Sequence, residues 1–177
     1  MQTTDYKIYD NEIPLNTVKT WEEVLMKDIS WKPVGWSGDA REPYRHWAAY
    51  PVFEGDIKSI WQSLDYSFKE DGYNLKPERV VTNLFGFGDS SWVHRDTDRS
   101  GEFTVLIYLN DFWDINWGGF TMLVDDQYDL IKAVKPMPGR FIMFPSDMIH
   151  GAAPVSREAP YPRFSLVYQC KRDKNLS

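Results

Sequence analysis

The sequence predicts a mainly β fold, a sandwich or barrel, with helices packed outside it. From about residue 78 onward, short runs of β-branched and aromatic residues alternate with Gly, Pro, Asp and Asn, as strands and turns do. Helical signals are confined to the first third of the chain. At 177 residues, of which 42% are hydrophobic, the chain is long enough for one core. We therefore expect a single domain over residues 1–177, with helical N-terminal support in 1–75 and a β-barrel core in 76–171.

Two helices are predicted in the N-terminal part. Thr20 followed three residues later by Glu23 resembles a capping box, which predicts a short helix over residues 21–29. From Asp56 onward, five apolar residues occupy one helical face, and Gly72 suits the end of that helix: Ile57, Ile60, Trp61, Leu64 and Phe68. Residues 31–54 are rich in Pro, Gly and Trp and show no period, so we expect an ordered surface segment there.

Six strands are predicted after these helices. Their sequences are RVVTNLF (79–85), FTVLIYL (103–109), GFTMLV (119–124), LIKAV (130–134), GRFIMF (139–144) and RFSLVYQ (163–169). Strands of this number and spacing are typical of a sandwich or barrel.

Charge and cysteine content restrict the partners. Twenty Lys and Arg against 26 Asp and Glu give a net charge of −6, which argues against a nonspecific nucleic-acid coat or a polybasic membrane anchor. The single cysteine, Cys170, excludes an internal disulfide framework and fits a reducing compartment. There is no signal-peptide pattern and no apolar run of about 20 residues. We expect a soluble cytoplasmic protein without a nucleic-acid or membrane partner.

Histidine is scarce, and its placement suggests a metal site. His94 and Asp96 are two residues apart, so in an extended chain both side chains point to one face and can chelate one ion. His150, after the strand that ends near Pro145, is the best third ligand, and two imidazoles with one carboxylate suit a first-row divalent metal. The remaining histidine, His46, is expected at the surface or at a substrate rim and not as a ligand.

A second pattern follows the last histidine. Arg163 and Ser165 share one face of the final predicted strand, where a guanidinium beside a hydroxyl can hold a carboxylate through charge-assisted hydrogen bonds. A buried arginine needs an anion, because an unpaired interior charge is costly. Tyr108 lies on a strand face that can point inward and offer a phenol group.

Together these residues resemble one enzyme family. His94-x-Asp96, Tyr108-Leu109-Asn110, Gly118-Gly119, Pro138-Gly139-Arg140, His150 and Arg163-x-Ser165 are similar in order and spacing to the Fe(II)/2-oxoglutarate-dependent dioxygenases, above all their prolyl 4-hydroxylase branch. The resemblance covers roughly residues 80–170.

The resemblance implies a double-stranded β-helix, a cupin-like jelly-roll barrel, with iron at its open mouth. It implies that His94, Asp96 and His150 bind Fe(II), and that Arg163 and Ser165 hold the distal carboxylate of 2-oxoglutarate with help from Tyr108. It implies a hydroxylase of an unactivated C–H bond in a prolyl or other peptidyl residue that uses O2 and releases succinate and CO2. Ascorbate dependence is common in the prolyl branch and is expected as an accessory requirement.

The sequence also offers candidates for other contacts with the cosubstrate and the substrate, most of which have an alternative interpretation. Asn83 is a candidate cosubstrate contact, with a polar position in a strand as the alternative. Trp92 and Trp117 are candidate substrate contacts, with simple packing as the alternative, and Arg95 between two proposed ligands is a third candidate.

Three other functions share part of this pattern. A 2-oxoglutarate oxygenase acting on a nucleobase or small molecule has the same iron site. A cupin-like metalloenzyme that does not use 2-oxoglutarate keeps the three ligands but has no need of Arg163 and Ser165. A non-enzymatic jelly-roll binding module needs no metal. The substrate and the oligomeric state are not determined by the sequence, because one fold and one iron site serve many chemistries.

Overall fold

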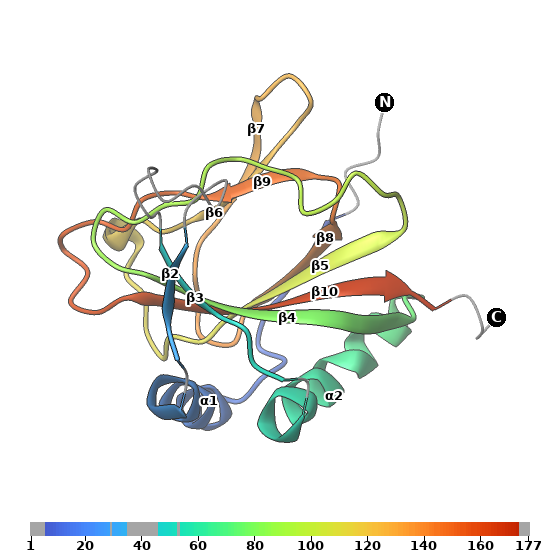
Figure 1. The fold of residues 1–177 in the computed structure, drawn as a ribbon, viewed down its shortest axis with the longest axis horizontal. Coiled ribbons are helices and arrows are strands. Elements are labelled where there is room, and N and C mark those ends of the chain that lie inside the picture. The colour runs from blue at the N-terminus through green and yellow to red at the C-terminus, as the bar shows by residue number, and fades with distance from the viewer. Residues whose placement is uncertain (1–5, 29, 35–45, 53, 174–177) are drawn as a thin grey trace.

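A computed structural model describes residues 6–28, 30–34, 46–52 and 54–173 of the chain. Two antiparallel sheets face each other. The larger has the strand order β1-β8-β5-β10-β4-β3-β2 and the smaller the order β7-β6-β9. Both helices lie on one side of the large sheet, and β6, β7 and β9 lie on its other side (Figure 1). The prediction of a mainly β barrel with helices outside it is therefore confirmed.

The described elements are, in chain order, β1 (Lys7–Tyr9), α1 (Leu15–Asp28), β2 (Lys32–Val34), β3 (His46–Ala49), α2 (Gly55–Glu70), β4 (Leu75–Phe85), β5 (Glu102–Tyr108), the 3₁₀ turn η1 (Ile115–Trp117), β6 (Thr121–Val124), β7 (Leu130–Val134), β8 (Phe141–Pro145), β9 (Ile149–Ala152) and β10 (Arg163–Arg172). All six predicted strands are present. The structure adds four that the sequence did not predict, namely β1, β2, β3 and β9.

Strand β10 lies in the middle of the large sheet, and its alternation separates the two sides of the fold. Phe164, Leu166 and Tyr168 pack into the core under the helices. The alternate positions of β10 line a cavity between the two sheets, and they are Arg163, Ser165, Val167 and Gln169. This is the period-two placement that the sequence predicted, because successive side chains of a strand point to opposite faces.

Helix α2 packs on the large sheet through the predicted apolar face, and Leu64 and Phe68 are completely buried. It ends in a Schellman motif: the N–H of Gly72 donates to Lys69 O at 3.0 Å and the N–H of Tyr73 donates to Phe68 O at 2.8 Å. Gly72 has a φ of +77°, which explains why glycine stands there. Within the described segments, neither helix has the length and apolar character needed to cross a membrane.

Helix α1 differs from its prediction. It begins at Leu15, directly after Pro14, whose carbonyl accepts hydrogen bonds from the N–H groups of Thr17 and Val18. Thr20 lies inside the helix, where its hydroxyl donates to Asn16 O at 3.0 Å, so the capping-box interpretation was wrong. The threonine makes the i−4 bond that is open to it within a helix.

The predicted surface segment over residues 31–54 was also wrong in part. Its described ends form β2 and β3, which extend the large sheet beyond β4, while residues 35–45 and 53 lie outside the described residues. Strand β1 pairs with β8 at the opposite edge. These strands have only three or four residues, too few to show a period. The N-terminal third therefore supplies strands to the barrel as well as helices.

Candidate metal centre and its cavity

The two proposed histidine ligands are brought together by backbone pairing. The N–H of His94 donates to His150 O at 2.8 Å, and the N–H of His150 donates to His94 O at 2.9 Å. His150 follows β8, as the sequence predicted, and lies within β9, a strand that the sequence did not predict. The stretch IHGA has only four residues, and one of them is a glycine, which is uncommon in strands. It therefore gave no strand signal in the sequence. The bridge fixes the two imidazole rings with centroids 4.6 Å apart.

Each imidazole is oriented by the carbonyl two residues before it. The Nδ1 of His94 lies 2.8 Å from Trp92 O, and the Nδ1 of His150 lies 2.9 Å from Met148 O. A carbonyl can only accept, so each ring carries its proton on Nδ1 and keeps a lone pair on Nε2 that can bind a cation. This is how metal-binding histidines are usually held.

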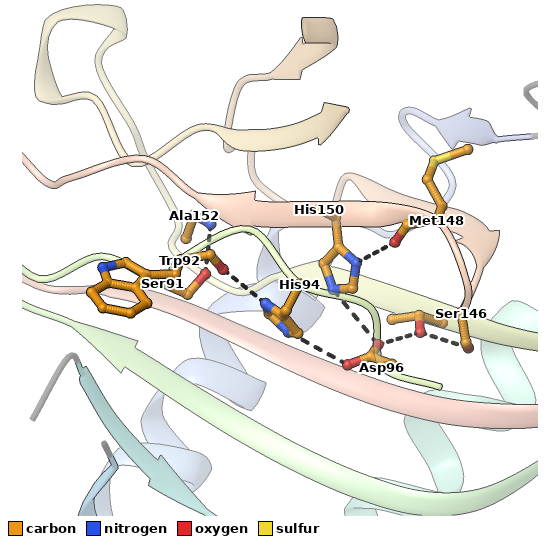
Figure 2. Close-up of polar contacts among 9 residues, drawn as sticks. Ser91, Trp92, His94, Asp96, Ser146, Met148, His150 and Ala152 are labelled. Atoms are coloured by element: carbon orange, nitrogen blue, oxygen red, sulfur yellow. Dashed lines mark hydrogen bonds and ion pairs between the residues drawn. The ribbon is translucent and has the colours of Figure 1, made fainter. Parts of the chain in front are cut away.

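Both Nε2 atoms point at one carboxylate, as Figure 2 shows. The Nε2 of His94 lies 3.7 Å from Asp96 Oδ1, and the Nε2 of His150 lies 3.6 Å from Asp96 Oδ2. One ligand atom from each of the three residues lies within 4.8 Å of the others. Separations of this size leave room for one cation at bonding distance from all three donors.

The electrostatics keep Asp96 ionised. Burial alone raises the pKa of Asp96, but the His94 hydrogen bond, the charge of His150 and the Thr104 hydroxyl outweigh it and lower the pKa to about 2. Burial lowers the pKa of His150 below the ordinary value, against the attraction of Asp96. Burial also acts to lower the pKa of His94, but Asp96 and Trp92 O raise it overall. The site therefore contains a permanent anion between two imidazoles, an arrangement suited to a divalent cation.

A pair of hydroxyl groups supports Asp96 from behind, and the sequence did not predict it. The Thr104 hydroxyl donates to Asp96 Oδ2 at 2.6 Å. The Ser146 hydroxyl lies 2.9 Å from Thr104 Oγ1 and donates to it, because the Thr104 proton is already used. Both residues are buried, and Ser146 O accepts the N–H of Asp96 at 2.9 Å. The available signal was that Thr104 shares a strand face with Tyr108.

Arg163 is a buried cation with few partners. It is 1% exposed, and one guanidinium N–H donates to Thr121 Oγ1 at 3.0 Å. Its Cζ lies 5.1 Å from the ring centroids of both Phe85 and Tyr108. Within the described part of the chain, no carboxylate pairs with it, and its Nε and the Ser165 hydroxyl have no hydrogen-bond partner. A buried charge without a counterion is unstable, so these groups indicate that an anionic ligand belongs here.

Two glycines allow the loop before β6 to pass close to this arginine. Gly118 and Gly119 have φ values of +68° and +65°. A Cβ on Gly118 would lie 2.6 Å from Pro154 O, and a Cβ on Gly119 would lie 3.1 Å from Arg163 Cδ. The predicted Gly-Gly motif therefore serves close backbone packing against the arginine.

The proposed ligands and Arg163 line one cavity of about 200 Å³. Its charged or titratable lining residues are Arg79, Arg163, Asp96, His46, His94, His150 and Tyr50. Apolar side chains such as Phe85, Leu106 and Phe144 form much of the remaining wall. The three donors and the guanidinium of Arg163 therefore face one common space with a mixed polar and apolar wall.

The other predicted cosubstrate contacts lie near Arg163. Asn83 lines the cavity opposite Ser165 in the β4–β10 register. Tyr108 is completely buried, and burial raises its pKa, so the phenol stays protonated. Its hydroxyl lies 2.7 Å from Thr121 Oγ1, which also accepts from Arg163. Tyr108 is thus placed to orient Thr121 and Arg163, and Thr121 is a cavity residue that the sequence did not identify.

The three predicted substrate contacts lie outside this cavity. The Trp92 indole points away from the metal-ligand group in Figure 2, because residues 91–93 are not a strand and do not follow period two. Trp117 packs against Phe112, Trp113 and Tyr161. Arg95 donates to Asp126 Oδ1 at 2.7 Å and to Asp147 O, along a neighbouring groove. Their substrate roles stay predictions, and their positions favour packing and ion pairing.

His46, expected at a surface or rim, lines the cavity from β3. Its ring stacks on Phe85 with centroids 4.5 Å apart, and its Nδ1 has no hydrogen-bond partner in the described residues. Burial lowers the pKa of His46 to about 4. A hydrogen bond with Asn83 acts to raise this pKa, and the charge of Arg163 lowers it further. His46 is therefore a neutral wall residue.

Comparison with known proteins agrees with this geometry. A family model described as the 2OG-Fe(II) oxygenase superfamily matches residues 80–168, half of the chain and nearly the span of the predicted resemblance. A search of curated protein sequences found no significant match.

Solved structures show the same fold at low sequence identity. A Pseudomonas putida prolyl-4-hydroxylase has a TM-score of 0.72 at 18% identity, with 97% of this chain and 94% of that chain covered. A Trichoplax adhaerens prolyl hydroxylase in complex with a hypoxia inducible factor peptide fragment has a TM-score of 0.73 at 15% identity, covering 96% and 84%. SnoN, a non-haem α-ketoglutarate-dependent epimerase from nogalamycin biosynthesis, has a TM-score of 0.71 at 12% identity, covering 98% and 83%. The double-stranded β-helix is thereby confirmed as the fold.

Proposed function

The chain belongs to the 2OG-Fe(II) oxygenase superfamily, and from that membership we propose that it hydroxylates an unactivated C–H bond of a prolyl or other peptidyl residue. The family implies Fe(II), 2-oxoglutarate and O2 as cofactor and cosubstrates. The observation that carries the assignment to this chain is the buried Arg163, which has no carboxylate partner among the described residues and shares a cavity with His94, Asp96 and His150.

The metal would be held by the Nε2 atoms of His94 and His150 and by the carboxylate of Asp96. Two imidazoles and one carboxylate would suit a first-row divalent ion and would leave positions on it for other ligands. Bound Fe(II) supplies the redox chemistry by which O2 oxidises 2-oxoglutarate to succinate and CO2 and hydroxylates the substrate. The chain's own contribution at this point is to orient both imidazoles, because the carbonyls of Trp92 and Met148 bind Nδ1 and leave Nε2 turned toward Asp96.

The opposite part of the cavity suits the distal carboxylate of 2-oxoglutarate. The Arg163 Nε–H can donate to it, and the Ser165 hydroxyl, which lacks a partner within the described residues, can donate as well. Thr121 and Tyr108 hold the guanidinium from the side. The apolar part of the wall lowers the local dielectric around these groups, which strengthens their charged contacts.

The peptidyl substrate is supported by fold similarity to two prolyl hydroxylases, one of which is bound to a peptide fragment. An oxygenase acting on a small molecule is the second candidate, supported by the similar fold of the epimerase. The net charge of −6 disfavours a nucleic-acid substrate, since phosphate contacts need Lys or Arg. We also propose that residues 1–177 form one catalytic domain, because both helices share a core with the barrel. Ascorbate dependence and a cytoplasmic location stay predictions.

The first experiment tests cosubstrate binding. Protein mixed with Fe(II) and 2-oxoglutarate without oxygen should give a weak visible charge-transfer band, and admitting oxygen should release succinate. Arg163→Met keeps an apolar side chain of similar length but removes the charge. Its 2-oxoglutarate affinity should fall by about 100-fold, since hydrogen bonds to charged groups contribute about 1.5–3 kcal/mol each.

Arg140→Met is the matched control. Arg140 lies outside the cavity and pairs with Asp10 through two hydrogen bonds of 2.6 and 2.7 Å, so its loss should leave 2-oxoglutarate binding unchanged. Unchanged 2-oxoglutarate affinity in Arg163→Met would contradict the role proposed for Arg163. Turnover that persists in this variant and needs no 2-oxoglutarate would favour the metalloenzyme that does not use 2-oxoglutarate. Absence of both the band and succinate release in the parent protein would refute the oxygenase assignment.

A further inference from the structure

A second arginine lines the same cavity as the proposed metal ligands. Arg79 lies on β4, opposite Gln169 of β10 in the strand register, and both residues line the cavity together with Tyr50. The Arg79 Cζ lies 5.2 Å from the centroid of the Tyr50 ring, and Tyr50 is 52% exposed. We refer to Tyr50, Arg79 and Gln169 as the cationic rim.

Arg79 has its ring contact but no ionic partner. In the described segments no carboxylate lies within ion-pairing distance of its guanidinium, although its chain neighbour Glu78 pairs with Lys171 at 2.5 Å. Arg79 is exposed, and its contact with the Tyr50 ring leaves its N–H groups free to donate to a planar anion. The Gln169 side chain offers further N–H donors beside it. The cationic rim is therefore organised to receive a carboxylate.

The charges of the cavity point the same way. With the metal and 2-oxoglutarate bound as proposed, the two positive charges of the ion and that of Arg163 balance Asp96 and the two carboxylates of 2-oxoglutarate. Among the lining residues, only Arg79 then carries a charge without a counterion. The protein as a whole has a net charge of −6, so this local cation is not part of a generally basic surface.

The strand register places the rim beside the metal ligands and away from the 2-oxoglutarate end. Gln169 is the register partner of Thr104, whose hydroxyl bonds Asp96. Arg79 is one strand further, so its backbone lies about 10 Å from that of Thr104 at ordinary strand spacing. Arg163 lies six residues away along β10, about 20 Å at the rise of a strand. The two guanidinium groups thus mark different regions of one cavity.

We propose, on the basis of the proposed function, that the cationic rim binds an acidic side chain of the peptide substrate. The backbone of Arg79 lies about 10 Å from that of Thr104, which supports Asp96, and an extended peptide advances about 3.3 Å per residue. We therefore place the acidic residue within about three residues of the one that is hydroxylated. The contact sets substrate preference: a peptide with Glu or Asp at that distance binds better than the neutral or basic peptide of the same length.

The test compares capped peptides that contain one proline and, at each position up to three residues on either side, Glu, Gln or Lys. Binding is measured by fluorescence anisotropy without oxygen, with Mn(II) and 2-oxoglutarate present, so the result does not depend on which residue is oxidised. Peptide-dependent succinate release is measured in parallel with Fe(II) and oxygen. At one or more positions the Glu peptide should bind about tenfold more tightly than the Gln peptide.

Two variants make the assignment specific. Arg79→Gln should abolish the preference for Glu, and Arg79→Glu should reverse it in favour of the Lys peptide. Arg157→Gln is the matched control, because Arg157 also lies over an exposed aromatic ring, 6.0 Å from the Phe87 centroid, but does not line the cavity. It should keep the preference for Glu unchanged.

The inference is overturned if Glu, Gln and Lys peptides bind equally or if Arg79→Gln keeps the preference for Glu. If no peptide binds, the inference fails together with the peptidyl substrate of the proposed function. The oxygenase assignment fails by a different result, namely absence of both the 2-oxoglutarate charge-transfer band and succinate release in the parent protein.

Discussion

The hydroxyl of Thr104 provides a direct test of how the metal site is supported. Thr104→Val removes the hydrogen bond of 2.6 Å to Asp96 Oδ2 and the 2.9 Å contact with Ser146 but keeps the shape of a side chain that is 1% exposed. A hydrogen bond to a charged group is worth about 1.5–3 kcal/mol, and 1.4 kcal/mol is tenfold in affinity. Because the hydroxyl orients Asp96 for the metal, we expect metal affinity to fall by about 10- to 100-fold.

The assay is a titration of the metal-free protein with Co(II) in competition with a chelator, followed by the visible spectrum of the bound ion. Thr104→Ser keeps the donor and should recover most of the affinity. The melting temperature of each metal-free variant shows whether the fold has changed. If Thr104→Val folds normally and binds Co(II) as tightly as the parent protein, the hydroxyl does not position Asp96 and the reasoning is refuted.

Three further predictions concern the glycine packing, acid sensitivity and the core. Gly119→Ala should weaken 2-oxoglutarate binding at least about tenfold, measured by titration of the charge-transfer band, because its Cβ would lie 3.1 Å from Arg163 Cδ at a φ of +65°; normal affinity would contradict this packing. Burial lowers the pKa of His46 to about 4 in the folded state, compared with about 6.5 in the unfolded chain. The stability that depends on its neutral form is therefore fully present above pH 6.5 and is lost as the pH falls toward 4. His46→Phe should therefore lose less stability between pH 6.5 and 4 than the parent in urea unfolding, and parallel curves would be inconsistent with a buried neutral imidazole. Leu64→Ala, at a completely buried α2 position, should lower the free energy of unfolding by about 2–5 kcal/mol, whereas a loss below 1 kcal/mol would mean that α2 is not part of the core.

Regular elements and the short motifs could be predicted because their signal is local. The apolar face of α2 repeats at helical spacing from Ile57 to Phe68. The alternation of β10 runs over ten residues, and this alternation is enough to put Arg163 and Ser165 together on the inner face. The chelating pair His94 and Asp96 was recognised from its spacing, and its meaning came from the order of the motifs around it.

Other parts of the fold and site depend on contacts between distant residues. Strands β1, β2, β3 and β9 have three or four residues each and exist because neighbouring strands, which come from other parts of the chain, offer edges to pair with. Trp92 was expected near the substrate because it lies two residues before His94 and would share its face in a strand, and Arg95 because it lies between two proposed ligands. The backbone around His94 is irregular, so adjacency does not determine the direction of those side chains.

The amino-acid sequence by itself determined the class of fold, the inner and outer faces of the long strands, and the identity of the groups proposed to bind metal and 2-oxoglutarate, because periodicity and spacing are properties of a single stretch of chain. Tertiary structure alone decided that Thr104 supports Asp96, that Gly119 passes beside Arg163, and that Arg79 lines the same cavity. These contacts join residues from different strands and loops, and their distances follow from how two sheets pack and from strand register, which no local pattern encodes.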